Sequence, residues 1–172
     1  NVAEITGTQY GDIFTSAFLG ASTTALSGKD YKRTDDGKII VNELGYPQIG
    51  ADKNKLIGNR EPRFISGLTN TFNYKNASLS FLLNGRLGGD VANVTGRGLL
   101  SNGQSKMLET YRGRQVVVDG VVLAADGSYV KNTTPITLDA QTLSNYFYAV
   151  SSNFIEDGSF LRLSYVTLSY DM

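Results

Sequence analysis

The segment from Arg63 to Leu87 constrains the fold more than any other part of the chain, because its apolar residues recur at every second position. Its sequence is RFISGLTNTFNYKNASLSFLLNGRL. Side chains of a β-strand point alternately to the two faces of a sheet, so this period of two predicts strands rather than a helix. The alternation is interrupted at Lys75-Asn76, which predicts a two-residue hairpin turn between two antiparallel strands.

The register of this hairpin follows from its turn. Residues that oppose each other across a two-residue turn have numbers that add to a constant, and opposed residues point to the same face. The pairs on one, mostly apolar, face are Tyr74/Ala77, Phe72/Leu79, Asn70/Phe81, Leu68/Leu83, Ser66/Gly85 and Phe64/Leu87, with Asn70 and Ser66 as polar exceptions. The pairs on the other, mostly polar, face are Asn73/Ser78, Thr71/Ser80, Thr69/Leu82, Gly67/Asn84 and Ile65/Arg86.

Each arm of the hairpin is long enough to cross a membrane. An arm of about eleven residues exceeds the ~5–6 of an average strand and matches the ~9–11 of a tilted transmembrane strand. A third long strand is predicted at residues 159–170, where the alternation slips near Ser164-Tyr165 and indicates a β-bulge. Short turns opposite long loops are typical of outer-membrane barrels. The chain is therefore predicted to be all-β, as part of a transmembrane antiparallel β-barrel with long extracellular loops.

The predicted organisation has four parts. They are an extracellular loop region with a short β-hairpin (1–62), the transmembrane hairpin (63–87), a long extracellular loop with β-hairpins (88–158) and a transmembrane strand (159–172). Tight turns of local hairpins are predicted at the Asp-Gly pairs Asp36-Gly37, Asp119-Gly120 and Asp126-Gly127. Because the smallest membrane barrels have about eight strands, three long strands cannot close one, and we expect the chain to be a fragment.

Composition narrows the possible functions. The 16 basic and 16 acidic residues give no net charge, so nothing favours a nucleic-acid partner. The chain has no histidine and no cysteine, which excludes thiol and imidazole catalysis within it.

The glycine-rich stretch at Thr95–Leu100 lacks the lysine of a phosphate-binding loop and is predicted to be an ordinary loop. Glu156 and Asp157, adjacent on a strand, would point to opposite faces and do not form a glycosidase pair. We expect no enzyme, catalytic residue, cofactor or metal.

Two groups of residues are candidates for ligand binding. Tyr111, Arg112 and Arg114 place an aromatic face beside guanidinium groups, which can stack on a sugar or bind an acidic group. Asn84 and Arg86 lie on the polar face of the predicted hairpin. The alternative for the first group is ion pairing with neighbouring parts of the protein, and for the second a wetted lumen.

Three longer motifs have the order and spacing of a known family. They are IGNREPRF (57–64), NTFNYKNASLSFLLNGRLGGDV (70–91) and EDGSFLRLSYVTLSY (156–170). Together with YGDIF (10–14) and the DDGKIIV hairpin that follows it, they resemble the C-terminal barrel region of SusC/RagA-type TonB-dependent transporters. The resemblance runs through most of the chain.

The resemblance implies energised import of large nutrients, oligosaccharides or peptides, across the bacterial cell outer membrane of Bacteroidota-type bacteria. It also implies a SusD-like surface lipoprotein as a lid, and contact with TonB through an N-terminal part that this chain lacks. The polar strand face would line the lumen and plug, and the apolar face would contact the lipid bilayer.

Two alternatives remain open. A soluble β-sandwich, such as a carbohydrate-binding or adhesin module, would bury the apolar strand faces against a second sheet. It would have many strands of ~5–7 residues at regular spacing, as sandwiches do. A siderophore-type TonB-dependent receptor would share the barrel and differ in cargo.

Overall fold

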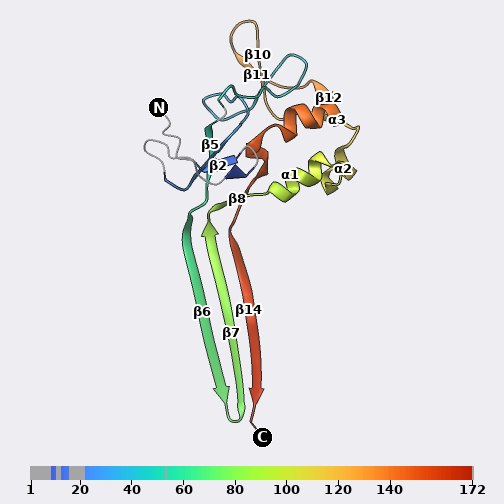
Figure 1. The fold of residues 1–172 in the computed structure, drawn as a ribbon. Coiled ribbons are helices and arrows are strands. Elements are labelled where there is room, and N and C mark those ends of the chain that lie inside the picture. Colours follow the sequence, from blue (N-terminus) through green and yellow to red (C-terminus); the bar gives the residue numbers. More distant parts are fainter. Residues whose placement is uncertain (1–8, 11–12, 16–21, 53, 172) are drawn as a thin grey trace. The chain divides into compact units, whose positions relative to one another are not determined.

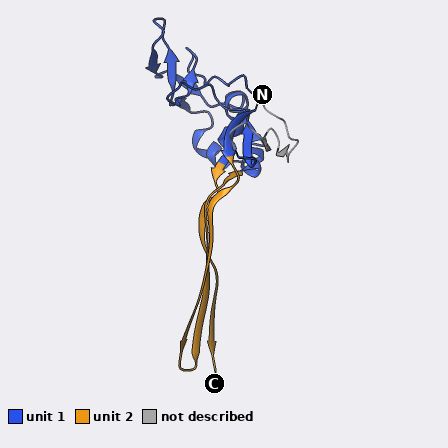
Figure 2. Ribbon diagram, turned by 90° about the vertical axis from the view of Figure 1, so that its left-hand side faces the viewer, with its two compact units in different colours: residues 1–58, 92–155 blue, residues 59–91, 156–172 orange. Residues whose placement is uncertain are grey.

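The structure, a computed structural model, describes residues 9–10, 13–15, 22–52 and 54–171 of the 172-residue chain. The YGDIF motif is thus described only in part, since its second and third residues lie outside these ranges. The chain divides into two compact units, coloured separately in Figure 2. Unit 1 comprises residues 1–58 and 92–155, and unit 2 comprises residues 59–91 and 156–172. Within the described ranges, no helix is long and apolar enough to cross a membrane.

Unit 2 is a three-stranded antiparallel sheet of long strands, which run side by side in Figure 1. In spatial order the strands are β14 (Phe160–Tyr170), β7 (Ala77–Gly88) and β6 (Pro62–Tyr74). The turn between β6 and β7 is Lys75-Asn76, and Lys75 takes the left-handed conformation with a φ of 51°. All the predicted pairs, from Phe64/Leu87 to Tyr74/Ala77, are confirmed. The alternation and the short turn therefore set the register.

A bulge in β14 places the apolar residues of its two halves on the same face of the sheet. Leu163 pairs with Leu83, and Tyr165 pairs with the next residue, Leu82, so Ser164 is the extra residue. The predicted bulge near Ser164-Tyr165 is confirmed. Because one inserted residue reverses the alternation, apolar residues at odd positions before the bulge and at even positions after it share a face. They are Leu161, Leu163, Val166, Leu168 and Tyr170, paired with Gly85, Leu83, Phe81, Leu79 and Ala77.

Most strands outside this sheet are short. One sheet has the order β1 (Gln9–Tyr10), β2 (Ile13–Thr15), β3 (Ala25–Gly28) and β5 (Lys55–Asn59). A second has the order β11 (Tyr129–Lys131), β10 (Val121–Leu123) and β4 (Ile40–Val41). Two further pairs are β12 (Pro135–Thr137) with β9 (Gln115–Val117), and β13 (Ile155–Asp157) with β8 (Asp90–Ala92).

Two of the three predicted Asp-Gly turns are confirmed, and the third is wrong. The Gly37 amide donates to the Thr34 carbonyl at 2.9 Å, and Asp126-Gly127 lies in the turn between β10 and β11. Asp119-Gly120 does not connect a hairpin, because β9 pairs with β12 while β10 pairs with β11 and, in parallel, with β4. Gly120 instead allows a close approach between segments, since a Cβ there would lie 2.5 Å from the carbonyl oxygen of Ile39.

Unit 1 also contains helices that the sequence analysis missed. They are α1 (Val94–Ser101), α2 (Lys106–Tyr111), α3 (Ala140–Thr142), the π-helix η1 (Leu143–Tyr148) and the 3-10 helix η2 (Ser151–Phe154). The prediction of an ordinary loop at Thr95–Leu100 is wrong, because this stretch lies inside α1. Helix α1 begins at Asn93, whose side chain accepts a hydrogen bond from the Gly96 amide at 2.6 Å. It ends before Gly103, which has a φ of 72°.

The helices and β12 enclose a hydrophobic core in unit 1. It consists of Leu100, Leu108, Ile136, Leu138, Leu143 and Phe154. Tyr46, Val116, Val118 and Phe147 pack against it from the outside. Strands still make up most of the regular structure, in agreement with the predicted all-β class, but the region predicted as a loop with hairpins (88–158) has a packed interior of its own.

Candidate functional site

The sheet of unit 2 has one mostly apolar face, with Ser66 and Asn70 as its polar exceptions. The register places Leu68, Leu83 and Leu163 in one row across the three strands, and Phe72, Leu79 and Leu168 in another. Leu161 and Leu168 remain 79% and 75% exposed, so none of the described residues of unit 2 covers this face. Exposed apolar surface of this extent marks a place where a protein meets another protein or a membrane.

The opposite face of the sheet is mostly polar. Thr71, Ser80 and Thr167 form one row, and the Thr71 and Ser80 hydroxyl oxygens are 3.1 Å apart. The predicted ligand residue Asn84 lies on this face and donates to the hydroxyl of Ser164, the bulge residue, at 2.8 Å. Asn84 therefore helps to hold the bulge. Its partner in the register is Arg162, which the sequence analysis missed because the bulge obscured the phase of β14.

Arg86, the second predicted residue of this face, binds the backbone at the end of β7. Its guanidinium donates to the carbonyls of Gly88, Arg60 and Gly89 at 3.2, 3.2 and 3.3 Å. Gly88 and Gly89 both have a positive φ, of 75° and 82°, so the chain turns sharply there. The geometry gives Arg86 a structural role at this turn.

Beside this turn lies a polar cavity of about 430 Å³, lined by Asn59, Glu61, Arg63, Leu87, Gly88, Gly89, Asp90, Asp157 and Ser159. Its carboxylates are engaged in local hydrogen bonds. Asp90 accepts from the Asn59 amide at 2.7 Å, and Asp157 accepts from the Ser159 hydroxyl at 2.7 Å. The Ser159 hydroxyl and amide hold the pKa of Asp157 below its usual range, with weaker help from the charges of Arg63 and Arg86. These contacts shape the ends of the strands.

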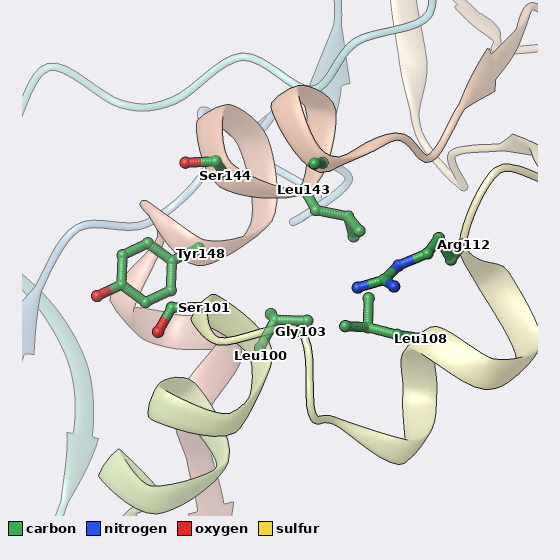
Figure 3. A pocket seen from close by; sticks show the side chains of 9 residues that line it. Leu100, Ser101, Gly103, Leu108, Arg112, Leu143, Ser144 and Tyr148 are labelled. Atoms are coloured by element: carbon green, nitrogen blue, oxygen red, sulfur yellow. The ribbon is translucent and has the colours of Figure 1, made fainter.

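In unit 1, the structure separates the three predicted ligand residues of the loop. Arg112 lines a cavity of about 180 Å³ between α1, α2 and the α3–η1 segment, shown in Figure 3. All three residues are exposed, and Tyr111 and Arg114 are not among the described residues that line it. The other lining residues are Leu100, Ser101, Gly103, Leu108, Ala140, Leu143, Ser144 and Tyr148. No sequence signal marked these residues, because they come from segments far apart in the chain.

One wall of this cavity is the ring of Tyr148, which buried neighbours hold in place. The Arg97 guanidinium lies 4.7 Å from the ring centroid, and the ring of Phe154 contacts it edge-on at 6.5 Å between centroids. Arg97 is 6% exposed. A cation over a tyrosine face and a T-shaped ring pair are both favourable, so the orientation of Tyr148 is fixed by packing.

A buried carboxylate joins three segments elsewhere in unit 1. Asp30 is 6% exposed and accepts hydrogen bonds from Arg33 at 3.0 Å, Lys55 at 2.9 Å and Ser152 at 2.7 Å. Burial raises the pKa of Asp30, but these bonds together outweigh it and hold the pKa well below the usual range. The charge is therefore satisfied internally, and this cluster fastens segments together.

The sequence of the chain is similar to that of a known receptor. Over 166 residues the chain is 23% identical to TonB-dependent receptor P3 of Formosa agariphila. The alignment covers 96% of this chain and 15% of that receptor, so the chain spans a small part of the relative's length. No family model matches the chain. The similarity links the chain to TonB-dependent receptors in general.

Proposed function

We propose that this chain is a segment of a TonB-dependent outer-membrane transporter, in which β6, β7 and β14 are adjacent strands of the transmembrane barrel. The observation that carries the proposal is the apolar face that runs in register across all three strands. The strands have 13, 12 and 11 residues, enough for the ~9–11 that a tilted strand needs to cross a bilayer. The similarity to a TonB-dependent receptor supports the same conclusion.

The ends of the apolar face favour lipid over a second protein sheet as its cover. Tyr74 and Tyr170 both pair with Ala77, at the end of the sheet next to the short turn, and Phe64 lies towards the other end. Barrels of the outer membrane carry aromatic girdles at both interfaces, where amphipathic rings meet the headgroups. Unsatisfied strand edges are very costly in lipid, so β6 and β14 would each pair with a further strand of the transporter.

The finer assignment rests on the motifs that resemble SusC/RagA-type transporters. It makes the cargo a large nutrient, an oligosaccharide or a peptide, and the partner a SusD-like surface lipoprotein. TonB would contact another part of the polypeptide. Residues 1–62 and 88–158 would lie outside the cell. The packed core of unit 1, formed by residues between 100 and 154, supports an ordered structure for that part.

The proposal can be tested on the intact polypeptide in its own cells. We expect the tagged protein to sediment with the outer membrane, to migrate faster on a gel before heating than after it, and to copurify with a surface lipoprotein. Uptake of its cargo should stop when the proton-motive force is collapsed. Recovery of a monodisperse protein without detergent would favour the soluble β-sandwich. If deletion of the gene impairs growth only under iron limitation, the assignment as a siderophore-type receptor would replace the assignment as a nutrient importer.

A further inference from the structure

The cavity in unit 1 combines one positive charge with apolar walls. Leu100, Leu108 and Leu143 line it together with Arg112. In Figure 3 the Arg112 guanidinium points towards Leu108 and Leu143, whereas the hydroxyls of Ser144 and Tyr148 point away from the leucines. A ligand that fits this arrangement has an anionic group next to an apolar one.

The volume limits the size of that ligand. At about 180 Å³ the cavity is smaller than the ~300–1,000 Å³ of sites for drug-sized molecules. It is slightly larger than an engineered cavity of about 150 Å³ that binds benzene. The cavity thus has room for a single group the size of a leucine or phenylalanine side chain.

The walls of the cavity are held in place before any ligand arrives. The π-helix η1 supplies Leu143, Ser144 and Tyr148, and helices of this rare type are frequent at functional sites. The Arg112 guanidinium passes close to Gly103, where a Cβ would lie 2.8 Å from its Nη2. Preorganised walls reduce the entropy lost on binding.

The charge of Arg112 is available to a ligand. The ion pairs of the described part of the chain involve Asp30 and Asp36, and Arg112 is in none of them. Arg112 is exposed, so a ligand can reach its guanidinium from solvent. A guanidinium group binds a carboxylate through two parallel hydrogen bonds.

We infer that this cavity binds the C-terminal residue of a peptide, with the terminal carboxylate on Arg112 and an apolar side chain against the leucines. The inference rests on the proposed function and makes peptides the cargo class that unit 1 recognises. An acidic sugar would offer the same carboxylate, but it would bring its hydroxyl groups against leucines that cannot hydrogen-bond them, which is unfavourable.

Binding to the intact, detergent-solubilised protein tests the inference. The probe is N-acetyl-phenylalanine, its uncharged match is N-acetyl-phenylalaninamide, and glucuronate represents an acidic sugar. The affinity of each is measured by ligand-observed NMR titration. We expect the acid to bind about tenfold or more tightly than the amide, the scale of a charged hydrogen bond. Arg112→Gln should abolish this preference, and Arg114→Gln should keep it, because Arg114 is equally exposed but does not line the cavity.

Equal affinity for the acid and the amide, or equal effects of the two arginine substitutions, would overturn the inference. Tighter binding of glucuronate than of the peptide probe would replace the peptide with an acidic glycan. Sorting of the same protein to the outer membrane is measured in parallel. Correct sorting without Arg112-dependent binding refutes the inference alone, whereas Arg112-dependent binding in a protein outside the outer membrane refutes the proposed function alone.

Discussion

Units 1 and 2 differ in whether their apolar residues are buried. Unit 1 gathers them into a core, where Ile136 is 2% exposed. Unit 2 spreads them over one face of a sheet, where Leu168 is 75% exposed. The hydrophobic effect stabilises a fold only when apolar surface leaves water, so unit 1 supplies its own cover and unit 2 requires one from outside. In our proposal that cover is the lipid bilayer.

The polar groups differ in the same way. In unit 2 the backbone hydrogen bonds of long paired strands are the main polar contacts, and the register fixes them. Unit 1 uses individual side chains, such as the buried carboxylate Asp30 and the helix cap Asn93. Substitutions of single polar side chains should therefore affect unit 1. Along the strands of unit 2, away from the contacts of Asn84 and Arg86, the larger effect should come from placing a charge on the apolar face.

The largest effect is expected from Ile136→Ala in the core of unit 1. Removing a large buried aliphatic side chain leaves a cavity and costs about 2–5 kcal/mol of unfolding free energy. Hydrogen exchange should lose protection in β9 and β12, and the amides of unit 2 should keep theirs. The matched control is Val117→Ala, an exposed residue of the same strand pair, which should stay within about 0.5 kcal/mol. Equal effects of the two substitutions would contradict the core assignment.

The next effect is specific to unit 2 in lipid. Leu83→Arg places a charge in the middle of the apolar face, which costs about 2–4 kcal/mol at the bilayer midplane of a barrel. Urea unfolding of the intact protein in liposomes measures this loss. Ser80→Arg, on the polar face of the same strand, should have little effect. A sheet in water would tolerate both substitutions equally, and that result would contradict the proposal that lipid covers the apolar face.

Asp30→Asn should destabilise unit 1 by about 1.5–3 kcal/mol at neutral pH, because it weakens charged hydrogen bonds to a buried group. The folded-state pKa of Asp30 is depressed, so its contribution is complete above the unfolded pKa, near 3.9, and is lost as the pH falls towards the folded value. The difference between wild type and variant, followed by thermal unfolding against pH, should therefore shrink below about pH 4. Asp36→Asn removes an exposed pair with Lys38 and serves as the control. An Asp30 effect that is independent of pH in acid would be inconsistent with this mechanism.

The smallest predicted effect concerns the start of α1. Asn93→Ala removes the hydrogen bond to the Gly96 amide and should cost about 1 kcal/mol, the usual value of a helix N-cap. Faster hydrogen exchange in the first turn of α1 would report the loss. Asn93→Ser keeps a capping oxygen and should restore most of the protection. If serine and alanine behave identically, the cap does not determine where the helix begins.

What the sequence predicts correctly in unit 2 is determined locally. The hairpin register depends on residues adjacent to Lys75-Asn76, and the slip near Ser164-Tyr165 is visible in the alternation of one strand. The polar and apolar faces of the hairpin then follow without knowledge of the rest of the protein. The faces of β14 and its pairing with β7, which place Arg162 opposite Asn84, required the structure, because they depend on the bulge.

Unit 1 could not be predicted in the same way, because its contacts join distant segments. The Asp119-Gly120 pair has the sequence of a hairpin turn, but β9 finds its partner in β12. The glycines at Thr95–Leu100 suggest a loop, but a capped end and the core contact of Leu100 make it a helix. Arg112 was a candidate from its residue type alone, and its leucine neighbours became visible only when α1, α2 and η1 were placed together.

The most direct test of the central claim is to measure which strand residues contact lipid in the intact protein. This chain has no cysteine, so single cysteines can be labelled within it at Leu163 and Val166 on the apolar face and at Ser80 and Thr167 on the polar face. We predict that a lipid-soluble quencher reaches labels at Leu163 and Val166, which share a face only because of the bulge, and that a water-soluble quencher reaches the other two. Labels at Leu163 and Val166 that lipid quenchers cannot reach would contradict the transmembrane sheet.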